Sequence, residues 1–208
     1  VLDAQDPDYK VIARYEAQTP VKPKIPLGTR GRLKGMPWEV IGYQVRATVI
    51  DDITYSWFEY LLHNPASGFR WLVASNGHWV LAKAAGGTPR IDSDKFAVYL
   101  GEHYPHFQSA RAKVTHVVGE FPWVVHVGSS AVVEDYVKPP LILSSERTQE
   151  ETTWSAGEYM EGEAVWKAFG LPGHPPERIG AGPSQPAPSA PRCPPMRTPL
   201  GACLAGSL

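Results

Sequence analysis

FRWLVASNGHWVLAK, residues 69–83, carries the strongest fold signal in the chain. Asn76-Gly77 lies between two apolar runs, and both residues tolerate positive φ, so this segment predicts a β-hairpin with a two-residue loop. Ser75 then pairs with His78. The same register predicts the pairs Val73 with Val80, Trp71 with Ala82, Leu72 with Leu81, and Ala74 with Trp79.

Both faces of this hairpin are apolar, whereas a hairpin with one solvated face alternates between apolar and polar residues. The second face is therefore either covered by another part of the chain or a contact surface. Leu72, Trp79 and Leu81 are the candidate residues for a partner surface.

Further β-branched and aromatic runs, separated by Gly, Pro, Asn and Asp, predict an antiparallel all-β domain. We expect a mainly β fold of meander or barrel-like sheets with about eight to nine strands and one short C-terminal helix. Pro139-Pro140 ends the last predicted strand. The predicted strands beside the hairpin are Trp38–Val49, Tyr55–His63, Phe96–Leu100, Ala112–Val118, Trp123–Val127 and Ala131–Val137.

The helix is predicted at Glu161–Phe169, followed by Gly170 at the position that favours a left-handed cap. A helix this short is marginal alone, so Trp166 and Phe169 must dock on the sheet.

Composition divides the chain into three parts. Residues 1–26 are expected to be a lead-in linker, 27–171 the β-rich module, and 172–208 a disordered tail that holds ten of the 21 prolines. Both cysteines, Cys193 and Cys203, lie in that tail. A disulfide-built secreted fold and a thiolate zinc site are therefore excluded for residues 1–171.

The net charge of −1 over 208 residues gives no basic field, so we expect no nucleic-acid partner. No apolar run reaches the length of a membrane span, and no signal peptide is visible. Because Val1 is not an initiator Met, we expect the chain to be a fragment or a processed piece.

Metal binding has one weak candidate pair. A hairpin centred on Phe121 would place His116 opposite His126. With Glu120 or Glu134, the pair would have the ligand types of a zinc-dependent hydrolase. The alternative is that both are ordinary polar strand residues, and we assign no metal and no cofactor.

Other catalytic patterns are weaker. The chain has no Gly-x-Ser-x-Gly elbow and no phosphate-binding loop in a strand–loop–helix context. Glu146, Glu150 and Glu151 could serve as acid–base carboxylates, but a solvated charge run is the simpler interpretation. We therefore expect a protein that is not an enzyme.

Arg46, Trp57 and Glu59 are the candidate ligand-binding residues. Glu59 shares a strand face with Trp57, and Arg46 on the preceding strand is its natural partner. A structural ion pair, or a cation–π contact of Arg46 on Trp57, explains the group without a ligand. The alternative is a binding pocket with these side chains at its floor.

An ordered set of strings resembles the bacterial family called domain of unknown function 4178, over roughly residues 25–188. The most specific strings are Trp57-Phe-Glu-Tyr-Leu-Leu62, Leu143-Ser-Ser-Glu146 and Trp154-Ser-Ala-Gly-Glu-Tyr159. The resemblance implies a β-rich module that is often present twice in longer bacterial proteins. No catalytic residues are established for the family.

Relatives often have a cysteine zinc ribbon before the module and membrane helices after it, and neither is present here. Their genes tend to lie near those of aminopropyltransferase-like and membrane-stress proteins. The resemblance thus implies an interaction or sensing module of a membrane-associated assembly with a protein partner. It implies a cytoplasmic location, with membrane association through a missing C-terminal part. The second hypothesis is a small-molecule-binding barrel, with a polyamine as one candidate ligand held by Glu59 and aromatic residues.

Overall fold

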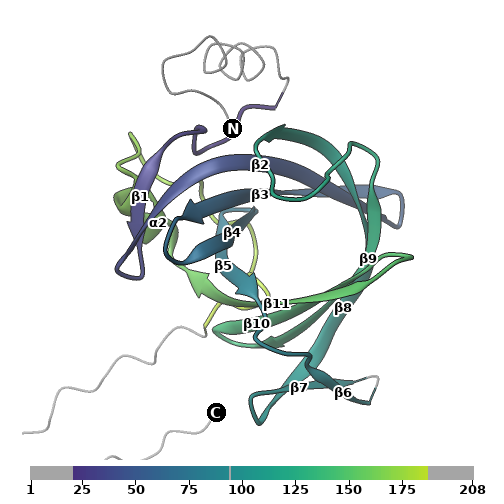
Figure 1. The fold of residues 1–208 in the computed structure, drawn as a ribbon. Helices are drawn as coiled ribbons and strands as arrows, with labels where there is room; N and C mark the ends of the chain where they lie inside the picture. The colour runs from purple at the N-terminus through teal and green to yellow at the C-terminus, as the bar shows by residue number, and fades with distance from the viewer. Residues whose placement is uncertain (1–20, 94, 187–208) are drawn as a thin grey trace, which may run out of the picture.

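The computed structural model describes residues 21–93 and 95–186, which form eleven antiparallel strands and one short helix. An additional pairing of β2 with β8 closes β2–β5 and β8–β11 into an eight-stranded barrel (Figure 1). This confirms the expected mainly β fold with a C-terminal helix. The elements are β1 (Arg30–Leu33), β2 (Met36–Ile50), β3 (Ile53–Asn64), β4 (Gly68–Ser75), β5 (His78–Ala84), β6 (Arg90–Ser93), β7 (Phe96–Tyr99), β8 (Glu102–Gly119), β9 (Ser130–Lys138), β10 (Leu141–Arg147), β11 (Thr152–Met160) and α2 (Gly162–Phe169).

The β4–β5 hairpin has the predicted register, with Ser75 opposite His78 and all four further pairs as expected. Asn76 and Gly77 both adopt positive φ, 49° and 78°, as this tight loop requires. Barrel closure depends on contacts that are distant in sequence: β5 pairs with β11, and β8 pairs with β2.

The predicted strand Trp123–Val127 is wrong, because these residues lie in the connection between β8 and β9. β8 instead extends over Glu102–Gly119, much longer than the predicted Ala112–Val118. The prediction missed β10 and β11, whose Ser, Thr and Glu residues weaken the apolar pattern. It also missed β1 and β6, which have four residues each.

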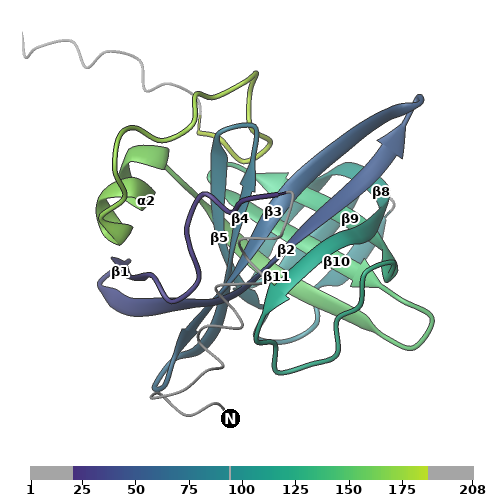
Figure 2. The same ribbon diagram turned by 90° about the horizontal axis from the view of Figure 1, so that it is seen from above.

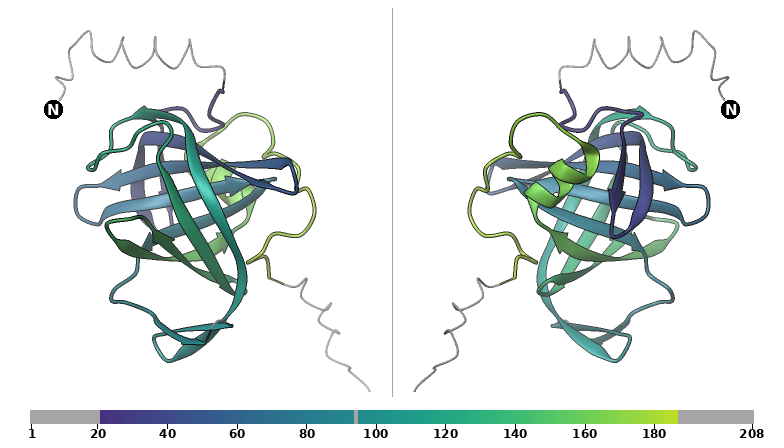
Figure 3. Two further views of the ribbon diagram at one scale, coloured as in Figure 1. Left: turned by 90° about the vertical axis from the view of Figure 1, so that its right-hand side faces the viewer. Right: turned by 90° about the vertical axis from the view of Figure 1, so that its left-hand side faces the viewer.

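The outer wall of β2–β5 is covered by the chain's own helix (Figure 3). Trp79 is 1% exposed and meets Trp166 of α2 edge to face at 5.6 Å, while Phe169 packs in the same cluster. The docking prediction for Trp166 and Phe169 is confirmed. The structure gives no support to the candidate partner surface, because Leu72 and Trp79 are buried within the chain and Leu81 is half-buried against them.

The helix itself follows Glu161, which adopts extended backbone angles, and ends at Gly170 in the left-handed region with φ 60°. The predicted glycine cap is therefore confirmed. Along residues 21–93 and 95–186, no helix is both long enough and apolar enough to cross a membrane.

Both predicted boundaries of the module need correction. Ile25, assigned to the lead-in, is fully buried, and the Lys24 amide donates a hydrogen bond to Tyr60 Oη at 2.8 Å. Residues 172–186, here called the C-terminal strap, pass over the β4–β5 turn (Figure 2). There the Ile179 amide donates to the Asn76 carbonyl at 2.9 Å. The remaining lead-in and tail, with Cys193 and Cys203, lie outside the described residues.

A second apolar cluster lies on the outer side of β9–β11. Tyr136 and Leu143 from the barrel pack with Ala97 of β7 and Tyr104 of β8, beneath the β6–β7 hairpin. Apolar packing thus covers two stretches of the barrel's outer wall.

Candidate functional site

The barrel strands turn polar side chains toward the interior. On β2, Gln44 and Arg46 alternate with Tyr43 and Val45, which belong to the outer apolar cluster. Successive strand residues point to opposite faces, so Gln44 and Arg46 face inward. Both are buried despite their polarity.

Arg46 reaches across the barrel interior. Its two terminal nitrogens donate to the two carboxylate oxygens of Glu146 on β10, at 2.8 and 2.9 Å. β2 and β10 are not neighbours in the sheet, so this bidentate contact must run through the interior. Burial alone would lower the pKa of Arg46, but attraction from Glu59 and Glu146 outweighs it and raises that pKa above its ordinary value. Arg46 therefore stays cationic.

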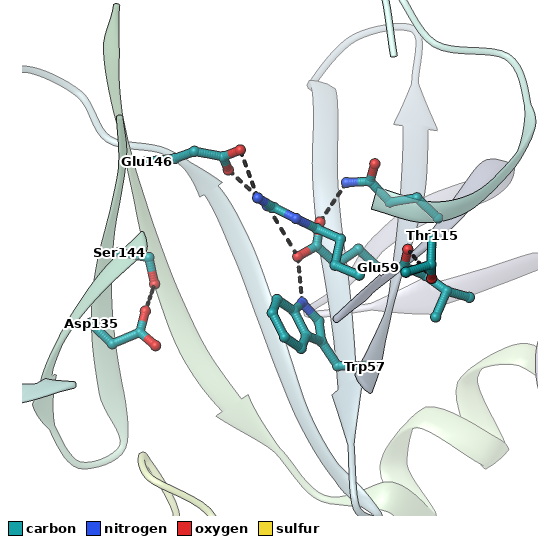
Figure 4. Close-up of polar contacts among 9 residues, drawn as sticks. Trp57, Glu59, Thr115, Asp135, Ser144 and Glu146 are labelled. Atoms are coloured by element: carbon teal, nitrogen blue, oxygen red, sulfur yellow. Dashed lines mark hydrogen bonds and ion pairs between the residues drawn. The ribbon is translucent and has the colours of Figure 1, made fainter. Parts of the chain in front are cut away.

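Glu59 on β3 is the second carboxylate partner of Arg46, with Oε1 3.6 Å from the guanidinium. The same Oε1 accepts a hydrogen bond from Trp57 Nε1 at 2.7 Å, and Oε2 accepts one from Gln44 Nε2 at 2.6 Å. The structure thus brings together the three predicted residues, and Figure 4 shows Glu146 pointing toward Glu59 and Trp57 from the opposite wall. The side chains of Arg46 and Glu59 are 6% and 12% exposed, against 41% for Glu146.

A second polar group lies on the β9–β10 wall. Asp135 accepts a hydrogen bond from Ser144 Oγ at 2.5 Å (Figure 4). It accepts another from Gln108 Nε2 at 2.8 Å. Burial raises the pKa of Asp135 above the usual aspartate value, and the two hydrogen bonds offset only part of that effect. Ser144 and Glu146 are two residues apart on one strand, so they share the inward face with Asp135.

Two buried polar atoms in this region have no hydrogen-bond partner among the described residues. They are Nε of Arg46 and Oε1 of Gln44. Such atoms are rare in folded proteins because leaving a buried donor or acceptor without a partner costs free energy. Both atoms lie beside the ion pairs that Arg46 makes with Glu59 and Glu146.

An aromatic residue packs against the interior at the end of β8. The Phe121 ring lies so close to Gly42 that a Cβ added there would be 2.9 Å from it. Phe121 also contacts Trp71, with ring centroids 6.1 Å apart. Glycine at position 42 therefore makes room for the ring.

The histidine pair does not form as predicted. His126 lies in the β8–β9 connection, so no hairpin pairs it with His116. His116 packs on Tyr43 at 5.9 Å on the outer side, and burial lowers its pKa. Within the described part of the chain, no three His, Cys, Asp or Glu residues are grouped as metal ligands.

The sequence prediction missed Glu146, Gln44 and the Asp135–Ser144 pair. The interpretation of Glu146 as part of a solvated charge run is wrong, because its carboxylate binds Arg46. A signal existed in the alternation: Ser144 and Glu146 flank Ser145 and follow the apolar Leu143, as expected for a strand with one polar face.

Comparison with known proteins identifies a family and little else. No curated protein matches the chain, and no solved structure matches it. Residues 26–162 match the family described as Domain of unknown function (DUF4178). The matched range contains all eight barrel strands. It also contains the inward-facing polar side chains described above, here called the interior polar group: Gln44, Arg46, Trp57, Glu59, Gln108, Asp135, Ser144 and Glu146. The chain therefore belongs to the DUF4178 family, as the ordered strings predicted.

Proposed function

We propose that the barrel is a small-molecule-binding module that holds its ligand beside Arg46, Glu59 and Glu146. The observation that carries this proposal is the bidentate contact between Arg46 and Glu146 through the barrel interior. An eight-stranded barrel has room either for its own side chains or for one small ligand.

Stability alone is a poor explanation for this interior. A buried ion pair often contributes no more to folding than apolar side chains of similar volume, because desolvation offsets the attraction. Arg46 and Glu59 are both largely buried, and the Arg46 Nε and Gln44 Oε1 atoms have no partner among the described residues. An arrangement of this kind favours a binding role.

The wider role expected from the family stays a prediction. A non-enzymatic sensing module in a membrane-associated assembly is compatible with a ligand-binding barrel, since the ligand would be the signal. The face formed by Leu72, Trp79 and Leu81 no longer supports a partner, because the chain's own helix covers it.

The test uses the indole signals of the seven tryptophans in a ¹H–¹⁵N NMR spectrum. Trp57→Phe identifies the Trp57 signal by its absence while keeping an aromatic ring at that position. A set of small organic probes that spans cations, including a polyamine, neutral molecules and anions is then added. We expect at least one probe to move the Trp57 signal, whose N–H donates to Glu59.

Trp166 provides the matched internal control, since its indole donates to the Pro172 carbonyl on the outer side of the barrel. A specific probe leaves its signal in place. If no probe of any charge moves the Trp57 signal, or if all indole signals move together, the binding proposal is wrong.

A further inference from the structure

The inner wall of the barrel is more exposed than the outer wall of the same strands. Three outward-facing residues of β4, β5 and β10 are fully or almost fully buried: Leu72, Trp79 and Leu143. Their inward-facing chain neighbours are only partly buried: Val73, Val80 and Ile142. A barrel whose interior is filled by its own side chains shows the opposite order.

Strand pairing establishes that these three apolar side chains face inward. Val73 is directly opposite Glu59 on β3 and directly opposite Val80 on β5, so all three share the inner face. A Cβ added at Gly157 would lie 2.6 Å from Val80 Cγ1 and 3.0 Å from Ile142 Cγ2, which places Ile142 on that face as well.

Partial exposure at these positions reports on the space inside the barrel. The eight strands form a closed ring, and Val73 and Val80 lie well inside their strands rather than at a strand end. Val133 of β9, which faces inward opposite Glu146, is partly exposed in the same way. Water therefore reaches apolar side chains within the barrel, as it does in barrels that hold one small ligand.

The apolar part of this wall begins directly beside the interior polar group. Val73 is paired with Glu59, and Val133 is paired with Glu146. Apolar surface in contact with water is unfavourable, and an apolar group that covers it gains free energy in proportion to the area removed from water. The ion pairs of Arg46 instead require a polar neighbour, because loss of hydration without compensation is costly for charged groups.

We propose that the ligand of the barrel is amphipathic, an inference that rests on the proposed binding function. Its apolar part packs against Val73, Val80 and Ile142, and its polar end lies beside Arg46 and Glu59. A wholly polar ligand would leave the apolar wall in contact with water, and a wholly apolar one would remove water from the ion pairs.

The experiment uses probes that share a hydroxyl head and differ in the apolar tail: 1-butanol, 1-pentanol and 1-hexanol. Glycerol is the probe with hydroxyl groups and no tail. Each is titrated into the wild-type chain at pH 7 while the Trp57 indole signal is followed. We expect saturable movement with the three alcohols and none with glycerol. Affinity should rise about fourfold with each added CH₂ group, since each is buried on binding.

Two neighbouring valines on β9 provide a matched pair of variants. Val133→Phe adds volume inside the barrel and should weaken 1-hexanol binding about tenfold or more, because the ring takes the place of the tail. Val132→Phe adds the same volume at a partly buried position on the outer face, and it should bind 1-hexanol as the wild type does. If Val133→Phe fails to fold, Val73→Leu provides the second test, since β4 lies across the barrel from β9.

The outcomes separate the two proposals. Equal affinity for the three alcohols, or equal 1-hexanol binding by wild type, Val133→Phe and Val73→Leu, overturns the amphipathic inference while the binding function stands. Movement of the Trp123 signal without the Trp57 signal also overturns the inference, because it places the probe on the 44% exposed Trp123 of the β8–β9 connection. If neither these probes nor the wider set moves the Trp57 signal, the binding function fails and the inference fails with it.

Discussion

Replacement of Arg46 by Met should destabilise the barrel more than any other single change in the interior polar group. The substitution removes the charge that Glu59 and Glu146 share, while the side-chain volume changes little. Loss of one partner from a buried ion pair costs about 3–5 kcal/mol, because the remaining charge stays buried.

Two structural features place Arg46→Met at the lower end of that range. Glu146 is 41% exposed and can regain solvent, and Glu59 keeps its hydrogen bonds from Trp57 and Gln44. We therefore expect a loss of about 3 kcal/mol in the free energy of unfolding. For a chain of this size, that corresponds to a fall in Tm of about 6–12 °C.

Urea denaturation at pH 7, followed by circular dichroism, measures this change. Glu146→Gln should lower the free energy of unfolding by about 1 kcal/mol or less, because the Glu146 side chain is 41% exposed. The double variant Arg46→Met/Glu59→Gln should be more stable than Arg46→Met alone, since it no longer buries an uncompensated carboxylate. Arg90→Met is the surface control, because that ion pair with Asp92 is exposed and should contribute less than about 0.5 kcal/mol.

Two results would refute this reasoning. The first is a free energy of unfolding for Arg46→Met within about 1 kcal/mol of the wild-type value, which would mean that the remaining interior carboxylates are solvated without Arg46. The second is a Glu146→Gln variant as unstable as Arg46→Met, which would make Glu146 rather than Glu59 the buried partner.

Two further predictions concern the same interior. Gly157→Ala should destabilise the fold by about 1–3 kcal/mol, because its Cβ would lie 2.6 Å from Val80 Cγ1 and 3.0 Å from Ile142 Cγ2. A Cβ added at Gly86 would lie 3.8 Å from its nearest neighbour, so Gly86→Ala should have the Tm of wild type. Equal Tm values for Gly157→Ala and Gly86→Ala would contradict this account. Asp135 has a folded-state pKa above its unfolded value, so the stability that its protonated form provides at low pH is lost as the pH rises through the folded pKa. As the pH rises above the ordinary aspartate pKa, the free energy of unfolding of wild type should therefore fall relative to that of Asp135→Asn. Urea denaturation of both proteins over a range of pH measures this difference, and a difference that does not change with pH would disprove the prediction.

Local sequence signals were sufficient where the paired residues are close in the chain. Asn76-Gly77 determines the β4–β5 register, and Gly170 determines the helix end. In both cases a positive φ at a defined position restricts the residue type. The apolar second face of the hairpin also indicated a cover, which the helix provides.

Barrel closure and the complete site could not be derived in the same way. Arg46 and Glu146 are 100 residues apart, and their contact depends on β8 pairing back to β2. Local alternation shows which face is polar, but it does not determine which distant strand faces it. The predicted group therefore included Glu59 on the neighbouring strand and omitted Glu146 across the barrel.

The distribution of apolar packing explains how this barrel tolerates a charged interior. Ile25 from the lead-in and Trp166 from α2 pack on one outer wall, and Ala97 of the β6–β7 hairpin packs on the other. Apolar burial outside the barrel thus provides stability that a small barrel usually obtains from side chains within it. The interior still holds buried apolar residues such as Leu61 and Val114, but it does not depend on them alone, so a polar residue such as Arg46 can be present there as well. The segments outside the barrel strands are therefore required for a stable barrel with polar residues in its interior.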